Sequence, residues 1–234
     1  MNESELEELA ERLRYLLRAG CIEESEQLFI EALEAVAASQ APASAALFAL
    51  LSEGLNIHRL AAENSRLDRI QLLQQALHIS CAAYGELSAE ATGVRRLLAA
   101  RRGLDRQGAQ AAELLGAVVE STRARGALAP RAQLARDLNE LGHSLLDCGE
   151  FERAREAFVE AQDRIRSLEV DLPLRALVSL GLARSYAALG SASEARATCE
   201  AALRELVGKV KPHSPILFEF DTVLRGLEPT TARS

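Results

Sequence analysis

Apolar residues recur at spacings of three and four over most of this chain, which is the pattern of amphipathic helices. The clearest example runs from Asp137 to Gln162 and breaks at Cys148-Gly149-Glu150. The apolar positions of its two halves are Leu138, Leu141 and Leu145, then Phe151, Ala154, Phe158 and Ala161. Gly142 and Ala154 are small at points where the halves must approach closely. The stretch therefore predicts an antiparallel helical hairpin.

The same pattern returns along the chain at a nearly constant interval. Residues 41 positions later match it in order, at Leu182, Tyr186, Gly190, Ala195, Cys199 and Ala202. The residues that mark the turn of each hairpin are Gly20, Asn64, Gly108, Gly149 and Gly190, with gaps of 44, 44, 41 and 41. Prolines support the same interval, at Pro42, Pro130, Pro173 and Pro215, with gaps of 88, 43 and 42 residues, of which the first equals two units. Periods of this length are typical of helical repeat arrays.

The periodicity predicts ten helices in five pairs and an eleventh at the end. The expected ranges are 3–19 and 22–38, 43–62 and 66–83, 88–105 and 109–125, 131–147 and 151–167, 174–189 and 192–208, and a last helix from Ser214-Pro215 to about Gly226. Asn2 or Ser4 is expected to cap the first helix, and Ser191 with Glu194 to form a capping box. No stretch has the character of a strand.

The matched positions resemble the tetratricopeptide repeat (TPR), whose signature Leu-Gly…Gly-x-Tyr/Phe…Ala…Phe…Ala is reproduced between Leu141 and Ala161. The interval of 41 to 44 residues exceeds the usual 34 and is similar to the long-repeat, kinesin-light-chain-like branch. The resemblance covers roughly residues 3–209. It implies an all-α, right-handed superhelical solenoid of about five TPR-like hairpins plus a C-terminal capping helix.

The predicted chain is a single domain with no internal boundary. The expected parts are a repeat array over 1–210, with repeats at about 3–38, 43–83, 88–125, 131–167 and 174–208, a capping helix over 211–227 and a disordered tail over 228–234. Phe218, Phe220 and Leu224 are expected to cover the open end of the array, because terminal repeats need a cap.

Charge and composition narrow the possible partners. The net charge is −7, and the basic residues do not form the clusters that phosphate contacts need, so neither nucleic acid nor a membrane surface is expected as a partner. The four cysteines show no metal-ligand spacing and are expected to be reduced thiols. The acidic N-terminus lacks a signal-peptide pattern. A cytoplasmic location is predicted.

Motifs for catalysis are sparse. Glu140 and His143 form one Glu-x-x-His step, half of a di-iron signature, and no second copy follows. His143 and Asp147 lie one helical turn apart but have no nucleophile or zinc-type third ligand beside them. Phosphate-binding glycine loops and protease motifs are absent from the sequence. No enzyme activity, cofactor or metal is predicted.

The most suggestive set of residues is a ladder of basic groups. Six residues before each turn marker stand Arg14, His58, Arg102, His143 and Arg184. The TPR resemblance implies that this position faces the concave groove lined by the first helix of each pair. Neighbouring groove positions add Arg95, Arg106, Arg136 and Asn139, whose amide is able to clamp a peptide backbone. The alternative is a row of solvated side chains paired with nearby carboxylates.

The sequence thus predicts a non-catalytic scaffold or adaptor that binds an acidic peptide or protein segment in the groove, through Arg–carboxylate contacts. Three alternatives remain open at this stage. The first is a regulatory or inhibitory partner that acts through the convex face or the loops. The second is self-association through an exposed edge. The third is an all-α enzyme with a buried carboxylate or histidine site.

Overall fold

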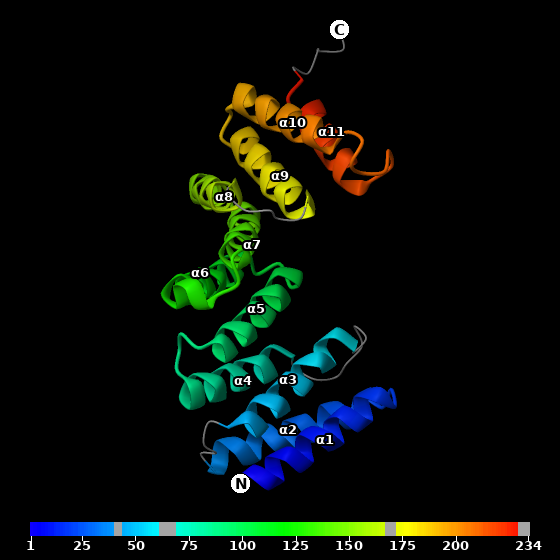
Figure 1. Ribbon diagram of the computed structural model, residues 1–234, viewed down its shortest axis with the longest axis vertical. Coiled ribbons are helices and arrows are strands. Elements are labelled where there is room, and N and C mark those ends of the chain that lie inside the picture. The colour runs from blue at the N-terminus through cyan, green and yellow to red at the C-terminus, as the bar shows by residue number, and fades with distance from the viewer. Residues whose placement is uncertain (40–43, 61–68, 167–171, 229–234) are drawn as a thin grey trace. The chain divides into compact units, whose positions relative to one another are not determined.

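A computed structural model describes residues 1–39, 44–60, 69–166 and 172–228, and within these ranges the chain is helical and contains no strand (Figure 1). Its packing divides the chain into two compact units, Met1–Asp105 and Arg106–Ser234. The first unit holds α1 (Glu3–Arg18), α2 (Ile22–Ser39), α3 (Ala45–Leu60), α4 (Arg69–Tyr84) and α5 (Ala89–Leu104). The second holds α6 (Gly108–Arg125), the short 3-10 helix η1 (Gly126–Leu128), α7 (Gln133–Asp147), α8 (Phe151–Arg166), α9 (Leu172–Ala188), α10 (Ala192–Leu206) and α11 (Pro215–Gly226).

The helix ends agree with the predicted ranges to within about three residues, and one of the two predicted caps is present. The Asn2 side chain accepts a hydrogen bond from the Glu5 N–H at 3.0 Å, and Glu5 accepts one from the Asn2 N–H at 2.8 Å. The capping box predicted at Ser191 is wrong, because that side chain makes no capping bond. Glu194 instead accepts a hydrogen bond from the Ser193 hydroxyl at 2.6 Å. The Glu194 carboxylate, which the capping box would have used, is therefore bonded to Ser193.

Three of the predicted turn residues hold the left-handed conformation that ends a helix. Gly20, Gly149 and Gly190 have φ values of 76°, 81° and 76°, and each stands two residues before the next helix begins. Glycine adopts this conformation without the clash of a Cβ atom. In the third hairpin the marker predicted at Gly108 is wrong, because Gly108 is the first residue of α6 and Arg106 takes the left-handed position with φ 57°. Asn64 lies outside the described residues.

In the first unit, α1 packs against α2 and α3, and α4 packs against α2 and α5. The largest side chains of its core are fully buried, namely Leu6, Leu13, Phe29, Leu33, Leu47, Leu50 and Leu73. Gly54 of α3 is essential to this core, because a Cβ there would lie 2.1 Å from the Phe29 ring. The close approach of two helices at a glycine, predicted for Gly142, thus also occurs here.

In the second unit each helix packs against the next along the chain, from α6 to α11 (Figure 1). Its core contains the buried side chains of Leu138, Leu145, Ala154, Phe158, Ala161 and Ile165, with Val178 and Leu182 of α9. Phe158 is fully buried, and its ring reaches Gly142 of α7 and Gly181 of α9. The predicted small-residue contact at Gly142 is confirmed, and Gly181 is a second one.

The last helix covers a second buried cluster, which contains Leu180 of α9 with Cys199 and Leu206 of α10. α11 packs against both α9 and α10. Phe220 is fully buried and Leu224 packs against the same cluster, but Phe218, expected to share this role, is 66% exposed. Among the described helices, none has the length and apolar character of a bilayer crossing.

Candidate functional site

In the second unit, the first helices of successive pairs lie next to one another. α9 contacts α7 on one side and α11 on the other. We call the surface formed by α7, α9 and α11 the A-face. His143, Arg184 and Glu219 line its cavity, and Asn139 lies buried on α7, one helical turn before His143. His143 and Arg184 belong to the predicted basic ladder, and Asn139 to its predicted neighbours. The A-face therefore brings together three of the candidate residues within one compact unit.

Arg184 is held by a carboxylate from the neighbouring helix. Its Nη2 donates to Glu219 Oε2 of α11, and both side chains are about two-fifths exposed. No other described residue accepts from Arg184, so Nε and Nη1 keep their donors available. A guanidinium binds a carboxylate best through two parallel donors. Arg184 is thus able to receive a second anionic group, or to exchange Glu219 for one.

The His143 side chain is partly buried. Its ring meets the Phe158 ring edge-on, with centroids 5.1 Å apart and planes at 73°. Burial lowers the pKa of His143 from its ordinary 6.5, the charge of Arg184 lowers it further, and Asp147 acts in the opposite direction. A neutral imidazole is therefore the folded state's preferred form. The lowered pKa therefore disfavours the imidazolium form, which a basic contact to an acidic segment would need.

The lowered pKa of His143 predicts how stability depends on pH. The unfolded chain binds this proton more readily than the folded chain, so folding is favoured above the unfolded pKa of about 6.5 and loses that contribution as pH falls below it. Urea unfolding of wild type and of His143→Gln at pH 7.5 and pH 5.5 measures the effect. The wild type is expected to lose more stability over this interval than the variant. Equal losses in the two proteins would show that His143 does not contribute.

Asn139 is the least satisfied polar side chain of the A-face. It lies one helical turn before His143 on the same side of α7. Its side chain is 8% exposed, and Oδ1 accepts a hydrogen bond from no described residue. A buried amide oxygen without a donor costs about 1–3 kcal/mol. Buried polar groups in native proteins are usually hydrogen-bonded to protein or to ordered water.

An open cavity of about 520 Å³ lies between α9 and α11. Its walls are mainly aliphatic, and its polar groups stand at His143, Arg184, Ser214 and Glu219. The residues that supply the apolar surface are Pro173, Ala176, Leu177, Leu180, Leu206, Val210, Pro215 and Ile216. An apolar floor with a few polar groups at its edge is the usual composition of a binding pocket.

The predicted residues of the first unit are engaged in other ways. Arg14 donates its Nε to Glu53 Oε1 of α3 at 2.7 Å, and this bond raises the pKa of Arg14. Arg95 donates to the Glu86 carbonyl and, at 3.6 Å, to Cys81 Sγ. These two hydrogen bonds link α5 to the end of α4 and to the turn that follows it. The side chain of His58 lies outside the described residues. Arg14 and Arg184 thus share one arrangement. Each is paired with a carboxylate from the helix that lies two helices further along the chain, α3 for Arg14 and α11 for Arg184.

The left-handed conformation of Arg106 changes which residue of the third repeat belongs to the basic ladder. Gly20, Gly149 and Gly190 place Arg14, His143 and Arg184 six residues before the left-handed turn. The same rule applied to Arg106 selects Ala100. Arg102 was selected by counting from Gly108, so it does not occupy the equivalent position. Arg106 itself forms the turn and is exposed, and Arg136 is exposed on α7.

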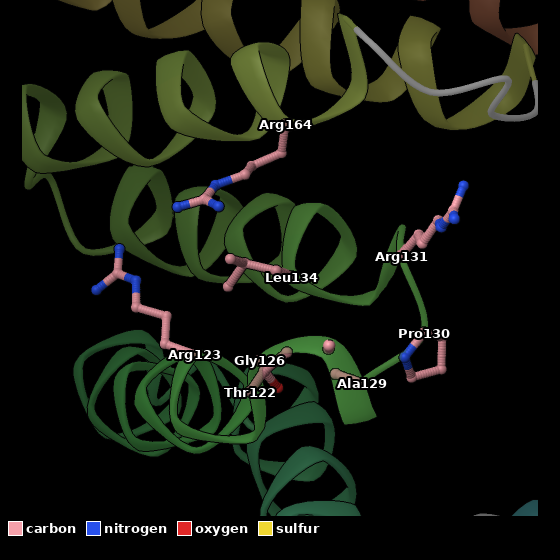
Figure 2. A pocket seen from close by; sticks show the side chains of 9 residues that line it. Thr122, Arg123, Gly126, Ala129, Pro130, Arg131, Leu134 and Arg164 are labelled. Atoms are coloured by element: carbon pink, nitrogen blue, oxygen red, sulfur yellow. The ribbon is translucent and has the colours of Figure 1, made fainter.

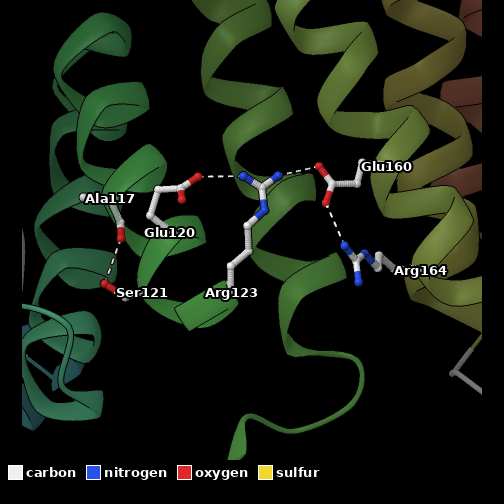
Figure 3. Close-up of polar contacts among 6 residues, drawn as sticks. All are labelled: Ala117, Glu120, Ser121, Arg123, Glu160 and Arg164. Atoms are coloured by element: carbon white, nitrogen blue, oxygen red, sulfur yellow. Dashed lines mark hydrogen bonds and ion pairs between the residues drawn. The ribbon is translucent and has the colours of Figure 1, made fainter. Parts of the chain in front are cut away.

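A second cavity, of about 660 Å³, lies at the corner between α6 and α7 and contains three arginines (Figure 2). Figure 2 shows the guanidinium of Arg131 directed away from those of Arg123 and Arg164. Arg123 bridges Glu120 at 2.6 Å and Glu160 of α8, and Arg164 bonds the same Glu160 at 3.3 Å (Figure 3). These pairs neutralise two of the three arginines and tie α6 to α8. This cavity is therefore a weaker candidate for an anion site than the A-face.

Residues of the A-face that the sequence analysis missed are Glu219 and the aliphatic wall of α9. A signal for that wall was present, because the sequence of α9, LPLRALVSLGLARSYAA, is apolar on all sides. A helix that is apolar all round needs a partner on more than one face. Leu177 nonetheless remains 41% exposed. Among the described residues, no group of three or more His, Cys, Asp or Glu is placed to hold a metal ion.

Comparison with known proteins places the fold. No protein-family model matches this chain, and no curated protein sequence matches it. Two crystal structures of nearly identical TPR-like repeats, from a protein of Podosopora anserina described as a kinesin light chain, superpose with TM-scores of 0.66 and 0.65. They are 18% and 19% identical, cover 89% and 91% of this chain, and are themselves covered over 98% and 99% of their length.

A third solved structure extends the likeness to nearly the whole chain. BtubC (BKLC) from P. vanneervenii has a TM-score of 0.61 at 18% identity, with 99% of this chain and 85% of that protein covered. The chain therefore has the fold of TPR-like kinesin light chain repeat proteins, an all-α helical solenoid, as its sequence predicted. Identities this low establish the fold and leave the ligand open.

Proposed function

We propose that this protein is a non-catalytic, cytoplasmic interaction scaffold that binds an acidic segment of a partner protein on the first helices of its repeats. Within the second unit the binding surface is the A-face, with Asn139, His143 and Arg184 as the contact residues. The TPR-like fold supports this proposal, because stacked helical pairs expose extended surfaces suited to protein recognition. Nucleic acid and membrane lipid are not the proposed partners.

Arg184 is the observation that carries the proposal, because it borders the open cavity between α9 and α11 and is about two-fifths exposed. Asn139 Oδ1 is closed to solvent and lacks a donor among the described residues, so a bound segment would donate to it only after the side chain turns outward. Arg184, with two nitrogens available, is suited to a carboxylate of the same segment. The other predicted residues, Arg14, His58, Arg95, Arg102, Arg106 and Arg136, remain candidates for further contacts, although the register argues against Arg102.

The proposal predicts that binding and stability respond differently to the same substitutions. Asn139→Ala removes an unsatisfied buried group, so stability should be unchanged or slightly increased. Combined with Arg184→Gln, it should weaken partner binding at least tenfold, since a charge-assisted hydrogen bond contributes about 1.5–3 kcal/mol. Pull-down from a lysate of the source cells, quantified by mass spectrometry, compares this double variant with wild type.

Arg204→Glu provides the matched control, because Arg204 is exposed on α10, outside the A-face. A partner retained by wild type and Arg204→Glu but lost from the double variant is the expected result. Equal retention by all three proteins would contradict the A-face as the binding surface. Circular dichroism verifies that all three retain their helices.

A regulatory partner that works through its turns is the second candidate function. The observation in its favour is the exposure of large apolar side chains at turns of the second unit, Leu128 at 89% and Val207 at 75%. Isolated exposed apolar residues are common on protein surfaces, so this evidence is weaker than the exposed guanidinium of Arg184 at the edge of the cavity. Binding that depends on Leu128 and not on Arg184 would favour this alternative, and light scattering would detect self-association through the same residues.

A further inference from the structure

The face of α9 that borders the cavity forms a straight stripe. Pro173, Ala176, Leu177, Leu180 and Arg184 line the cavity at successive spacings of three, one, three and four residues, which places them on one side of the helix. The twelve residues from Pro173 to Arg184 span about 16 Å of helix, or three turns. The stripe is apolar along its length and ends at a charged residue. Its length and pattern match one face of a short amphipathic helix.

The opposite wall comes from α11 and the segment before it. Val210 and Ile216 contribute aliphatic surface, and Glu219 stands across from Arg184. Leu177, the most prominent aliphatic residue of the α9 stripe, is 41% exposed although it lies within the cavity. The cavity of about 520 Å³ is larger than one side chain and is open to solvent. It therefore has room for several side chains of an added segment.

The chemistry of the walls favours a helical occupant over an extended one. An extended segment presents unpaired N–H and C=O groups at every residue, and these need partners when they are covered. The walls belong largely to helices, whose own backbone groups are bonded internally, and their side chains here are mainly Ala, Leu, Val and Ile. A helix arrives with its backbone groups satisfied except for the first N–H and last C=O groups at its two ends.

We propose that the cavity between α9 and α11 binds an amphipathic helix of the partner, with aliphatic residues at spacings of three and four and an Asp or Glu that meets Arg184. The partner's carboxylate exchanges with Glu219, which occupies Arg184 in the free protein. This inference rests on the proposed function and assigns its ligand a conformation and a chemical class. Complementarity of charge at Arg184 and of apolar surface along α9 defines both.

A random library of 16-residue peptides displayed on phage tests the proposal with the full chain as bait. Selected peptides are expected to carry Leu, Ile, Val or Met at helical spacings beside an Asp or Glu, and to become helical when bound. Leu177→Glu should weaken them at least tenfold by placing a charge in the apolar stripe. Leu128→Glu is the matched control, because Leu128 is exposed and does not line this cavity; it should leave binding unchanged.

Glu219→Gln provides a second variant that does not depend on disrupting the stripe. Removal of the competing carboxylate should strengthen binding of the acidic peptides several-fold, whereas Glu200→Gln on the exposed side of α10 should not. Two results would overturn the inference and leave the proposed function intact. One is a set of peptides whose binding depends on Asn139 and Arg184 but which bind in an extended conformation. The other is a set whose affinity is unchanged by both Leu177→Glu and Glu219→Gln. A library from which nothing depends on any A-face residue would overturn both.

Discussion

Gly181→Val is expected to destabilise the second unit by about 3 kcal/mol. A Cβ at Gly181 would lie 2.2 Å from Cε1 of Phe158, and one at Gly142 would lie 2.6 Å from Cζ of the same ring. The ring tip is thus confined by glycines of two helices, α7 and α9, and is fully buried. It has no space into which to retreat, so α9 must shift away from α8. Urea unfolding followed by circular dichroism measures the loss.

Two further variants separate this crowding from the general effect of replacing a helical glycine. Gly116→Ala in α6 meets no atom within 4 Å, so it should stabilise by up to about 1 kcal/mol through helix propensity. Phe158→Ala alone should cost about 3–5 kcal/mol. Combined with Gly181→Val it should cost clearly less than the sum, because the valine fills part of the space left by the ring. Additive losses would contradict the proposed packing.

Asp137→Ala is expected to cost about 3 kcal/mol, for a different reason. Asp137 is fully buried at the start of α7. Its Oδ2 accepts from the Thr122 hydroxyl of α6 at 2.6 Å, and Oδ1 accepts from Gln133 Nε2 at 2.9 Å. Removal of the carboxylate takes the acceptor from both donors, and the Thr122 side chain is buried. Equilibrium unfolding in urea measures the cost.

Asp137→Asn and Thr122→Val define the contribution of this network. The asparagine keeps an acceptor and should lose less than the alanine, since only part of the bonding is removed. The double variant Asp137→Ala/Thr122→Val also removes the hydroxyl that has lost its acceptor. Its loss of unfolding free energy should therefore be smaller than the sum of the losses of the two single variants. A negligible effect of Asp137→Ala would show that the α6–α7 contact does not depend on this bond.

The helices could be predicted from the sequence because their apolar residues follow one period and their turns use glycine. Gly20, Gly149 and Gly190 mark these turns correctly. The third turn could not be located in this way, because Arg106 adopts a conformation that favours glycine while a glycine two residues later is helical. Tertiary packing can hold a non-glycine residue in such a conformation at a small cost. The error of two residues then displaced the predicted rung from Ala100 to Arg102.

The candidate site was predictable only in part, for reasons of distance along the chain. The periodicity placed Asn139, His143 and Arg184 on first helices. The carboxylates that meet the arginines come from helices distant in sequence, Glu53 of α3 for Arg14 and Glu219 of the capping helix α11 for Arg184, and no local sequence pattern predicts these pairs. The burial of His143 depends on the Phe158 ring, which only the packed structure reveals. Whether a basic residue is available to a partner is thus decided by its neighbours in space.

Hydrogen–deuterium exchange of the full chain, with and without the retained partner or a selected peptide, locates the bound ligand on the molecule. Binding on the A-face should slow exchange in α7, α9 and α11, with α8 and α10 little changed. The Asn139→Ala/Arg184→Gln variant should lose this protection, and Arg204→Glu should keep it. Protection confined to α8, α10 or the turns around Leu128 and Val207 would contradict the A-face as the binding surface.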